Sequence, residues 1–193
     1  MGNIVLFMHS SLDGFAAGTQ GELNWVHVDE EIFDYIGKRI TKTNTALYGR
    51  VTFEMMESYW PTAADQPGAS KHDREHAAWY ASARKVVLSN TLDETALKNT
   101  TVIGKDYATA IRKLKNETTG EILLFGSPTT AHALFAENLI DDCWLFVNPV
   151  LLGEGIPVFR DLKEKQLLKL LQTHVFSSGV VCLHHELLHE NNQ

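Results

Sequence analysis

Two spacings of hydrophobic residues alternate along the chain. Short apolar runs, which are typical of strands buried in a sheet, occur at 4–8, 45–48, 85–89, 101–103, 121–125 and 143–147. Stripes with apolar residues three and four positions apart, which are typical of amphipathic helices, occur at 29–40, 106–114 and 128–135. A short helix is expected at 52–59, and the weakly patterned segment 71–83 can also be helical. Strands that alternate with helices in this way favour βαβ units and a parallel sheet.

The predicted helices are bounded by residues with strong local preferences. Residues suited to capping a helix N-terminus precede three of them: Asp29, Asp106 and Ser127. Pro128 suits the first helical position. Pro61 is expected to stop the helix over 52–59, because proline lacks the backbone N–H that a helix interior needs. The glycine-rich stretch 10–25 is predicted to be a loop.

The end of the chain has a different pattern. Apolar-rich segments at 167–176 and 180–188 flank Ser177-Ser178-Gly179, which predicts an antiparallel hairpin. The expected fold is therefore α/β, with a mainly parallel sheet and a C-terminal antiparallel hairpin. A length of 193 residues suits one core, so we expect a single domain over 1–193.

Composition narrows the class of protein. Hydrophobic residues make up 44% and charged residues 21%, as in a globular protein, and the net charge of −7 argues against a nucleic-acid or anionic-membrane binder. Cys143 and Cys182 lie far apart, which fits a reducing compartment. No apolar run approaches the length of a membrane helix, and the N-terminus is typical of a first strand rather than of a signal peptide. We expect a soluble cytoplasmic protein.

Polar groups that suit a phosphate follow three of the predicted strands. The segments are Gly49-Arg50-Val51-Thr52, Ser89-Asn90-Thr91 and Gly126-Ser127-Pro128-Thr129. Ligands of open α/β sheets bind beyond the carboxyl ends of the strands, where helix N-termini offer free N–H groups. Each segment alone is also typical of an ordinary turn followed by a helix cap. The three together favour a site for a phosphorylated cofactor.

Several of these segments carry a family resemblance. Residues 45–54, which include Gly49-Arg50-Val51-Thr52-Phe53-Glu54, resemble a segment of dihydrofolate reductases, and 85–92 resembles their next cofactor strand. Ser11-Leu12-Asp13-Gly14, 121–129 and 139–159 are similar to the reductase domain of the bifunctional riboflavin-biosynthesis deaminase–reductase. The resemblance covers essentially the whole chain. It implies a dihydrofolate-reductase-like three-layer fold and a stand-alone, single-domain reductase.

The resemblance also implies NADPH as the hydride donor. Its phosphates are expected near Gly49, Arg50 and Thr52, its adenosine 2′-phosphate near Ser89 and Thr91, and its pyrophosphate near Gly126, Ser127 and Thr129. Gly14 and Asn90, which lie within the matching motifs, complete the expected cofactor-binding set. Residues 55–61 depart from the family pattern, and the zinc deaminase motifs are absent. The substrate therefore stays open among ribityl- or ribosyl-aminopyrimidines, pterin-like compounds and other small heterocycles.

A proton must accompany the hydride, and a carboxyl group is the expected source. Burial raises carboxyl pKa values toward neutrality, which suits a proton relay. Asp13 is the first candidate, with the alternative that it only shapes its turn. Asp29 and Glu30 are further candidates, with the alternative that both are helix-start residues. An apolar wall for a flat ring can come from four aromatic residues that otherwise suit a core: Trp25, Phe33, Tyr59 and Trp60.

Two other readings compete with a reductase. His185-Glu186-Leu187-Leu188-His189 matches the zinc-protease motif, but that motif needs a helix, whereas this run continues a predicted strand. On a strand the two histidines lie about 13 Å apart, which is too far to share one ion, so we expect no metal. A non-catalytic nucleotide-binding or structural protein of the same fold is the second alternative. We also expect a homodimer through the C-terminal strands, because an apolar sheet edge needs cover.

Overall fold

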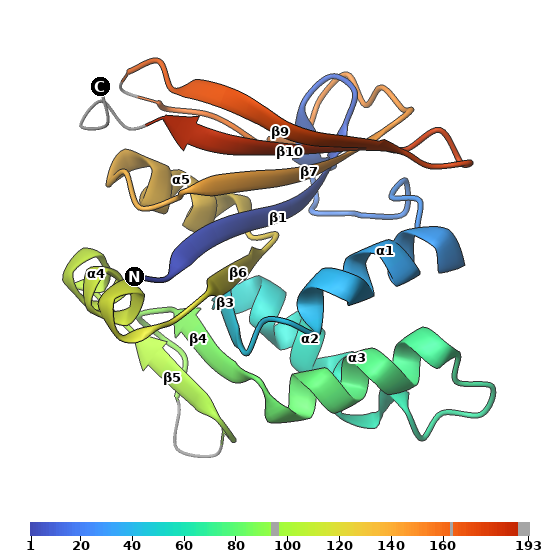
Figure 1. Cartoon of the computed structure of the whole chain (residues 1–193), viewed down its shortest axis with the longest axis horizontal. Helices are drawn as coiled ribbons and strands as arrows, with labels where there is room; N and C mark the ends of the chain where they lie inside the picture. The colour runs from blue at the N-terminus through green and yellow to red at the C-terminus, as the bar shows by residue number, and fades with distance from the viewer. Residues whose placement is uncertain (94–96, 163, 189–193) are drawn as a thin grey trace. The chain divides into compact units, whose positions relative to one another are not determined.

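The chain divides into two compact units, each assembled from segments that are distant in sequence (Figure 1). The first unit comprises residues 1–2 and 28–123, and the second comprises residues 3–27 and 124–193. The structure is a computed structural model that describes residues 1–93, 97–162 and 164–188. The single domain expected over 1–193 stays a prediction.

The described part of the first unit contains parallel strands and the helices α1 to α4. Its strands follow the order β5-β4-β3-β6, with bounds β3 (Thr45–Gly49), β4 (Arg84–Leu88), β5 (Thr100–Ile103) and β6 (Glu121–Phe125), the last crossing into the second unit. The helices are α1 (Glu30–Ile40), α2 (Arg50–Ala63), α3 (Lys71–Ser82) and α4 (Tyr107–Glu117). β3 pairs with β4 in parallel, as β4 does with β5, so their carboxyl ends share one edge. The predicted stripe of α1 buries Ile32, Ile36 and Ile40.

The second unit ends the sheet with antiparallel strands. Its elements are β1 (Asn3–Ser11), β2 (Phe15–Ala17), α5 (Pro128–Ala136), β7 (Asp142–Asn148), β8 (Ile156–Pro157), β9 (Leu167–Val175) and β10 (Val181–Leu188). The strand order is β1-β7-β10-β9, with β7 parallel to β1 and β10 antiparallel to both neighbours. Its core includes mutually packed rings of Phe7, Phe125, Trp144 and Phe146. The main sheet is thus mostly parallel with a C-terminal antiparallel hairpin, which confirms the predicted fold class.

Three predictions made from neighbouring residues in the sequence were wrong: the end of α2, the loop over 10–25 and the side-chain cap of α4. Helix α2 continues through Pro61 to Ala63, because a proline in the last turn removes one hydrogen bond from a helix that ends two residues later. The predicted loop 10–25 contains β2, which pairs with β8. Asp106 stands before α4, but its side chain makes no capping hydrogen bond.

No helix in the described part of the chain is both long enough and apolar enough to span a membrane.

Candidate functional site

The carboxyl edge of the first unit gathers two of the predicted cofactor segments. Gly49 lies opposite Leu88 in the β3–β4 register, so Arg50 and Ser89 both begin just beyond the same edge. The turn after β5 joins them, since a Cβ added at Gly104 would lie 3.3 Å from the Oδ1 atom of Asn90. The structure therefore brings 49–52 and 89–91 to one edge, as the sequence predicted.

The guanidinium of Arg50 is exposed at this edge and held only loosely. Arg50 is the first residue of α2, and its Nη1 donates to both carboxylate oxygens of Glu54 at 2.9 and 2.8 Å. An exposed pair one helical turn apart contributes at most a few tenths of a kcal/mol, roughly 0.3–0.5. Gly49, at the N-cap position, supplies no side-chain cap. An anion can thus compete with Glu54 for Arg50 and also meet the open helix end.

Ser89 shapes the neighbouring turn through its hydroxyl. Its Oγ accepts the N–H groups of Thr91 at 3.1 Å and Leu92 at 3.0 Å, and lies 3.5 Å from the Thr91 hydroxyl. Asn90 is exposed beside it, and Thr52 is half-buried in the first turn of α2. The edge therefore presents a cation, hydroxyls and backbone N–H groups, which are the donors that phosphate oxygens accept.

In the second unit, Gly126 and Ser127 form a turn of unusual backbone geometry before α5. Both have positive φ, 50° at Gly126 and 56° at Ser127, which is strained for a residue with a Cβ. The Gly126 N–H donates to the Phe7 carbonyl at 2.8 Å. The Ser127 hydroxyl donates to Thr130 Oγ1 at 3.0 Å and does not cap the helix. Ser127 thus occupies the predicted N-cap position, but the predicted cap through its side chain is wrong.

Thr129 lies exposed in the first turn of the same helix. Because no side chain caps α5, its first N–H groups are left to other partners. This is the arrangement that a pyrophosphate contact requires, although α5 has only nine residues.

Asp13 joins two loops of the second unit instead of standing free. Its carboxylate accepts the Ser11 hydroxyl at 2.6 Å and the backbone N–H groups of Leu152 at 3.1 Å and Gly153 at 2.8 Å. The hydrogen bond from Ser11, followed by that from Gly153, lowers the pKa of Asp13. The raised carboxyl pKa that the proton-relay hypothesis required is therefore not found at Asp13. Gly14 next to it has φ of 88°, a conformation that suits glycine.

Asp29 and Glu30 both lie at the start of α1. Asp29 is its N-cap, and its Oδ1 accepts the Ile32 N–H at 2.9 Å, which confirms the predicted capping role. Glu30 is exposed beside a hollow of about 260 Å³. Residues from α1 and from around the start of α3 line it with Glu30: Phe33, Asp34, Ser70, Lys71 and His72. The catalytic roles of Asp29 and Glu30 stay predictions.

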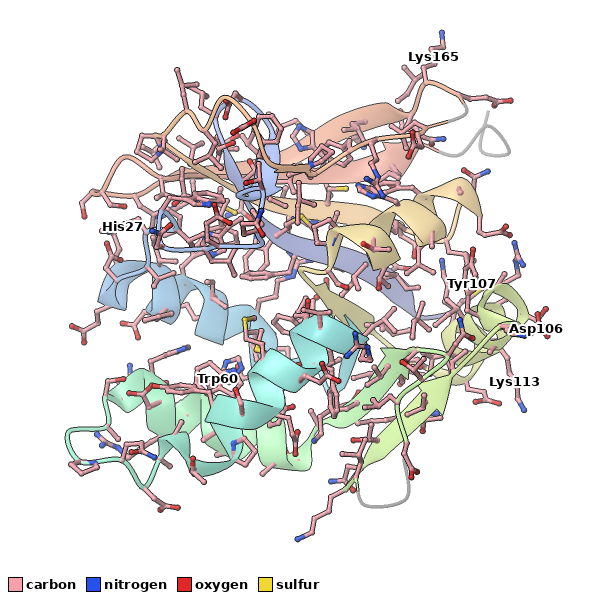
Figure 2. All side chains as sticks on the ribbon, turned by 180° about the vertical axis from the view of Figure 1, so that it is seen from behind. His27, Trp60, Asp106, Tyr107, Lys113 and Lys165 are labelled. Carbon is pink, nitrogen blue, oxygen red and sulfur yellow. The ribbon has the colours of Figure 1, made fainter. Side chains whose placement is uncertain are left out.

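Of the four aromatic residues considered as a ring wall, three belong to one cluster of the first unit. The Phe33 ring stacks on His72, with ring centroids 3.7 Å apart. The ring of Trp60, which is labelled in Figure 2, lies 4.9 Å from that of Tyr59 and 3.9 Å from that of His76. Burial lowers the pKa of His76 to about 3, so this imidazole is neutral. Trp25 belongs to the second unit, where its Nε1 donates to the Glu22 carbonyl.

Sequence reasoning missed a buried polar centre at the end of β7. Asn148 is 1% exposed, and its Nδ2 donates to the carbonyls of Phe146 at 3.0 Å and Ser10 at 3.3 Å. Its Oδ1 accepts the His27 N–H at 2.9 Å. His9 Nδ1 lies 3.4 Å from the same amide, and burial lowers the pKa of His9 to about 4. The only sequence signal was a histidine that ends the first apolar run.

The zinc-protease motif lies on a strand. β10 includes His185 and Glu186, which as successive strand residues point to opposite faces, and His189 lies outside the described residues. Within the described ranges, no group of three or more His, Cys, Asp or Glu side chains is placed to hold a metal ion. The helix that the motif requires is replaced by a strand, as the sequence predicted.

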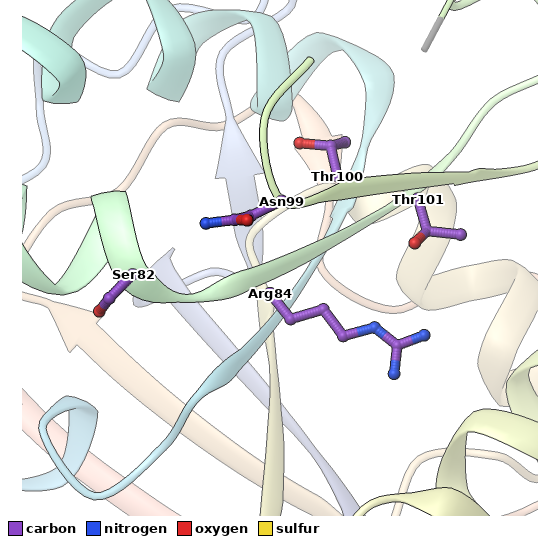
Figure 3. A pocket seen from close by; sticks show the side chains of 5 residues that line it. All are labelled: Ser82, Arg84, Asn99, Thr100 and Thr101. Carbon is purple, nitrogen blue, oxygen red and sulfur yellow. The ribbon is translucent and has the colours of Figure 1, made fainter. Parts of the chain in front are cut away.

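A polar hollow of about 340 Å³ lies away from the predicted cofactor edge. It is lined by Ser82, Arg84, Asn99, Thr100 and Thr101. Arg84 and Thr100 begin β4 and β5, so the hollow is at the amino ends of these strands. The Arg84 side chain extends away from Ser82 and Asn99 (Figure 3). Because its polar groups do not converge on one point, we assign it no ligand.

The fold is that of the dihydrofolate reductases. Dihydrofolate reductase from Enterococcus faecalis, solved in complex with NADP(H) and RAB-propyl, is similar with a TM-score of 0.61 and 18% identity, over 98% of this chain and 97% of that one. Residues 3–182 match the RibD C-terminal domain, and the chain belongs to that family.

Two further likenesses agree with this assignment. The uncharacterised protein YyaP of Bacillus subtilis is 33% identical over 183 residues, which are 92% of this chain and 91% of that protein. The structure of a putative riboflavin biosynthesis protein from Shewanella sp. PV-4 is similar with a TM-score of 0.71 and 23% identity, over 98% of this chain and all of that one. Family and fold together support a reductase-type function.

Proposed function

We propose that this protein is an NADPH-dependent reductase that transfers hydride to a small heterocycle in the cytoplasm. The class of substrate proposed is a ribityl- or ribosyl-aminopyrimidine or a pterin-like ring. The observation that carries the proposal is the carboxyl edge of the first unit, where Arg50 and the turn 89–91 offer donors for a phosphate. Family membership supports the reductase chemistry.

The residues of this edge fit the phosphates of the cofactor. NADPH, when bound, supplies the hydride. Arg50 provides a guanidinium fork for a phosphate, and the hydroxyls of Thr52, Ser89 and Thr91 are the donors proposed for the 2′-phosphate. Gly126, Ser127 and Thr129 of the second unit stay the residues proposed for the pyrophosphate. Gly14 and Asn90, which lie within the matching motifs, complete the proposed cofactor-binding set.

Cofactor titration tests the proposal directly. We expect the wild type to bind NADPH more tightly than NADH, and Arg50→Ala to weaken NADPH about tenfold or more, because a charge-assisted hydrogen bond contributes roughly 1.5–3 kcal/mol. Fluorescence titration measures both affinities. Arg84→Ala is the matched control, since Arg84 is also exposed but lies at the opposite end of β4. Equal affinity of the wild type for NADPH and NADH would contradict the proposed binding site for the 2′-phosphate.

The substrate class is tested by turnover. NADPH oxidation is screened with pterins, flavins and aminopyrimidines as acceptors. Oxidation that depends on one of these ring classes supports the reductase. Tight NADPH binding without turnover of any of them favours the non-catalytic nucleotide-binding alternative.

The low pKa of Asp13 changes its proposed role from proton donor to positioning residue. An ionised Asp13 holds the loop at Leu152 and Gly153 and orients the reacting groups, while water supplies the proton. Asp13→Asn is then expected to keep NADPH affinity and to slow single-turnover hydride transfer, by up to about a hundredfold if the geometry shifts by an ångström. Near-normal hydride transfer would assign Asp13 to loop structure alone and return attention to Asp29 and Glu30.

A further inference from the structure

His9 places a polar ring on an aromatic face of the second unit. It lies near the end of β1, where its ring stacks on that of Phe146 with centroids 5.1 Å apart and meets the edge of Phe7 at 6.0 Å. Both phenylalanines are buried. Burial lowers the pKa of His9 to about 4, so its imidazole is neutral at neutral pH. Because buried polar atoms are costly without hydrogen bonds, the two ring nitrogens need partners.

Asn148 fixes which ring nitrogen of His9 carries the proton. The Oδ1 atom of Asn148 accepts the His27 N–H at 2.9 Å, so its Nδ2 atom faces three other polar groups. These are the carbonyls of Phe146 at 3.0 Å and Ser10 at 3.3 Å, and Nδ1 of His9 at 3.4 Å. An amide nitrogen can only donate, so Nδ1 of His9 accepts and the proton of the neutral ring lies on Nε2.

The Nε2–H group of His9 is left as a donor. Over the residues that the structure describes, Nδ1 has Asn148 beside it, whereas Nε2 has no hydrogen-bond partner. The side chain is half-buried rather than enclosed. A donor held in an aromatic environment gains most from a partner that also leaves water, because unmade hydrogen bonds are costly there. The group is therefore suited to an acceptor atom of a ligand.

His9 also lies beside the turn proposed for the pyrophosphate of the cofactor. The Gly126 N–H donates to the Phe7 carbonyl at 2.8 Å, which places this turn next to β1, two residues before His9. β1 and β7 end together, with Ser11 opposite Asn148. In a dinucleotide, a single ribose separates the pyrophosphate from the reactive ring, a span similar to the spacing of one or two strands, about 5–10 Å. The end of β1 is therefore within reach of that ring and of the substrate that must lie against it.

We propose that His9 binds the heterocyclic substrate, its Nε2–H donating to a carbonyl oxygen or an unprotonated ring nitrogen, while Asn148 holds the imidazole in the tautomer that can donate. This role rests on the proposed reductase function. A neutral imidazole that lost its proton would become an anion, so His9 orients the substrate and does not supply the proton that accompanies the hydride. A heterocycle with an N–H in place of the acceptor would meet a second donor and bind weakly.

Nitrogen-15 NMR of histidine-labelled protein tests the tautomer without turnover. We expect His9 of the wild type to show a protonated Nε2 and an unprotonated Nδ1, its signals being assigned by their loss in His9→Gln. Pterin and 5,6-diaminouracil, which both carry a carbonyl oxygen, are then added in the presence of NADP⁺. The Nε2 signal should shift with each probe that binds. A proton on Nδ1, or a bound probe that leaves this signal unmoved, overturns the proposal.

Isothermal titration calorimetry measures the affinity for the same probes. His9→Phe keeps a ring beside Phe146 but removes the donor, so it should weaken probe binding about tenfold or more and leave NADPH affinity unchanged. His9→Gln, which retains an N–H donor, should recover part of the loss. Far-ultraviolet circular dichroism checks that both variants fold.

A matched control replaces another histidine that lies beside a phenylalanine ring. The ring of His174 is 4.6 Å from that of Phe176, but His174 belongs to β9 at the edge of the sheet, so His174→Phe should bind the probes as the wild type does. Unchanged probe affinity in His9→Phe, or an equal loss in His174→Phe, overturns the role of His9. A wild type that binds NADPH tightly but neither probe overturns the substrate class. Failure of the proposed reductase function is distinguishable from both, since it would appear as a wild type without affinity for NADPH.

Discussion

The strand ends of the first unit and those of the second carry similar polar residues, but these side chains are engaged to different degrees. In the first unit, Arg50 forms an exposed ion pair with Glu54. In the second, Asn148 and Asp13 each make several hydrogen bonds to residues far away in sequence. Groups that are loosely held can exchange their partner for a ligand, whereas groups that are fully engaged fix the loops. Arg50 is therefore the residue proposed to bind a ligand, whereas Asn148 and Asp13 fix their loops.

The largest effect expected from this comparison is on Asn148. Asn148→Ala removes a buried amide and leaves two carbonyls and the His27 N–H without that partner. We expect the free energy of unfolding to fall by about 3 kcal/mol, since unsatisfied buried groups cost about 1–3 kcal/mol each. Urea unfolding measures this change. The exposed Asn24→Ala serves as control, and equal losses in the two variants would show that Asn148 is not a structural centre.

The next effect concerns acid stability through His9. Its pKa is about 4 in the folded protein and near 6.5 when unfolded, so between these values the unfolded chain binds more protons. Stability is therefore lost as the pH falls from about 6.5 toward 4, by at most about 1.4 kcal/mol per pH unit from this group. His9→Phe keeps the ring beside Phe146 and should reduce the loss measured between pH 7 and pH 5.

Part of that loss should remain in the variant, because His76 titrates in the same sense. An unchanged loss in His9→Phe would contradict the lowered pKa.

A smaller effect is expected at the strained turn before α5. Ser127→Gly and Ser127→Ala both lose the hydrogen bond to Thr130, but only glycine adopts a φ of 56° without a Cβ clash. The free energy of unfolding of Ser127→Gly should therefore exceed that of Ser127→Ala by about 1 kcal/mol. Equal thermal stability of the two variants would show that strain at this residue is not what matters.

The smallest expected effect is on the stability of Arg50→Ala. Because its ion pair is exposed, the free energy of unfolding should change by no more than about 0.5 kcal/mol, although NADPH affinity falls at least about tenfold. Chemical denaturation without cofactor checks the first number. A large fall in the free energy of unfolding would show that Arg50 stabilises the fold, as Asn148 and Asp13 do, and would contradict the difference between the two units.

The spacing of hydrophobic residues over short segments was enough to predict most helices and strands. It failed where the structure of a segment depends on residues far away in sequence. The stripe of α1, the parallel strands and the C-terminal hairpin follow from spacings within a few residues. The pairing of β2 with β8 does not, because each strand has only two or three residues and its partner lies about 140 residues away. The same limit hid Asn148, whose contact with His27 spans 121 positions.

Only part of the candidate site could be predicted from the sequence. The residue types at 49–52 and 89–91 and their common edge follow from sequence, because parallel strands align their carboxyl ends. The role of Asp13 did not follow, because its pKa is lowered first by the hydrogen bond from Ser11 and then by those from Gly153 and Leu152, and only folding brings the last two residues near. Ser127 shows the same for backbone conformation, since the residue type gave no sign of a left-handed φ.

The pairing of β1 with β7 has a consequence for synthesis in the cell. Leu6 lies opposite Cys143, so the ribosome makes 137 further residues before this position of β7 exists, and β7 is one of the two neighbours of β1 in the sheet. At about 5–20 residues per second, that interval lasts roughly 7–27 s. Meanwhile residues 28–123, nearly all of the first unit, emerge complete. The nascent chain must therefore protect an N-terminal strand with fully buried Ile4, Val5 and Leu6 from aggregation while another part of it folds, which makes translation speed and chaperone supply determinants of its yield.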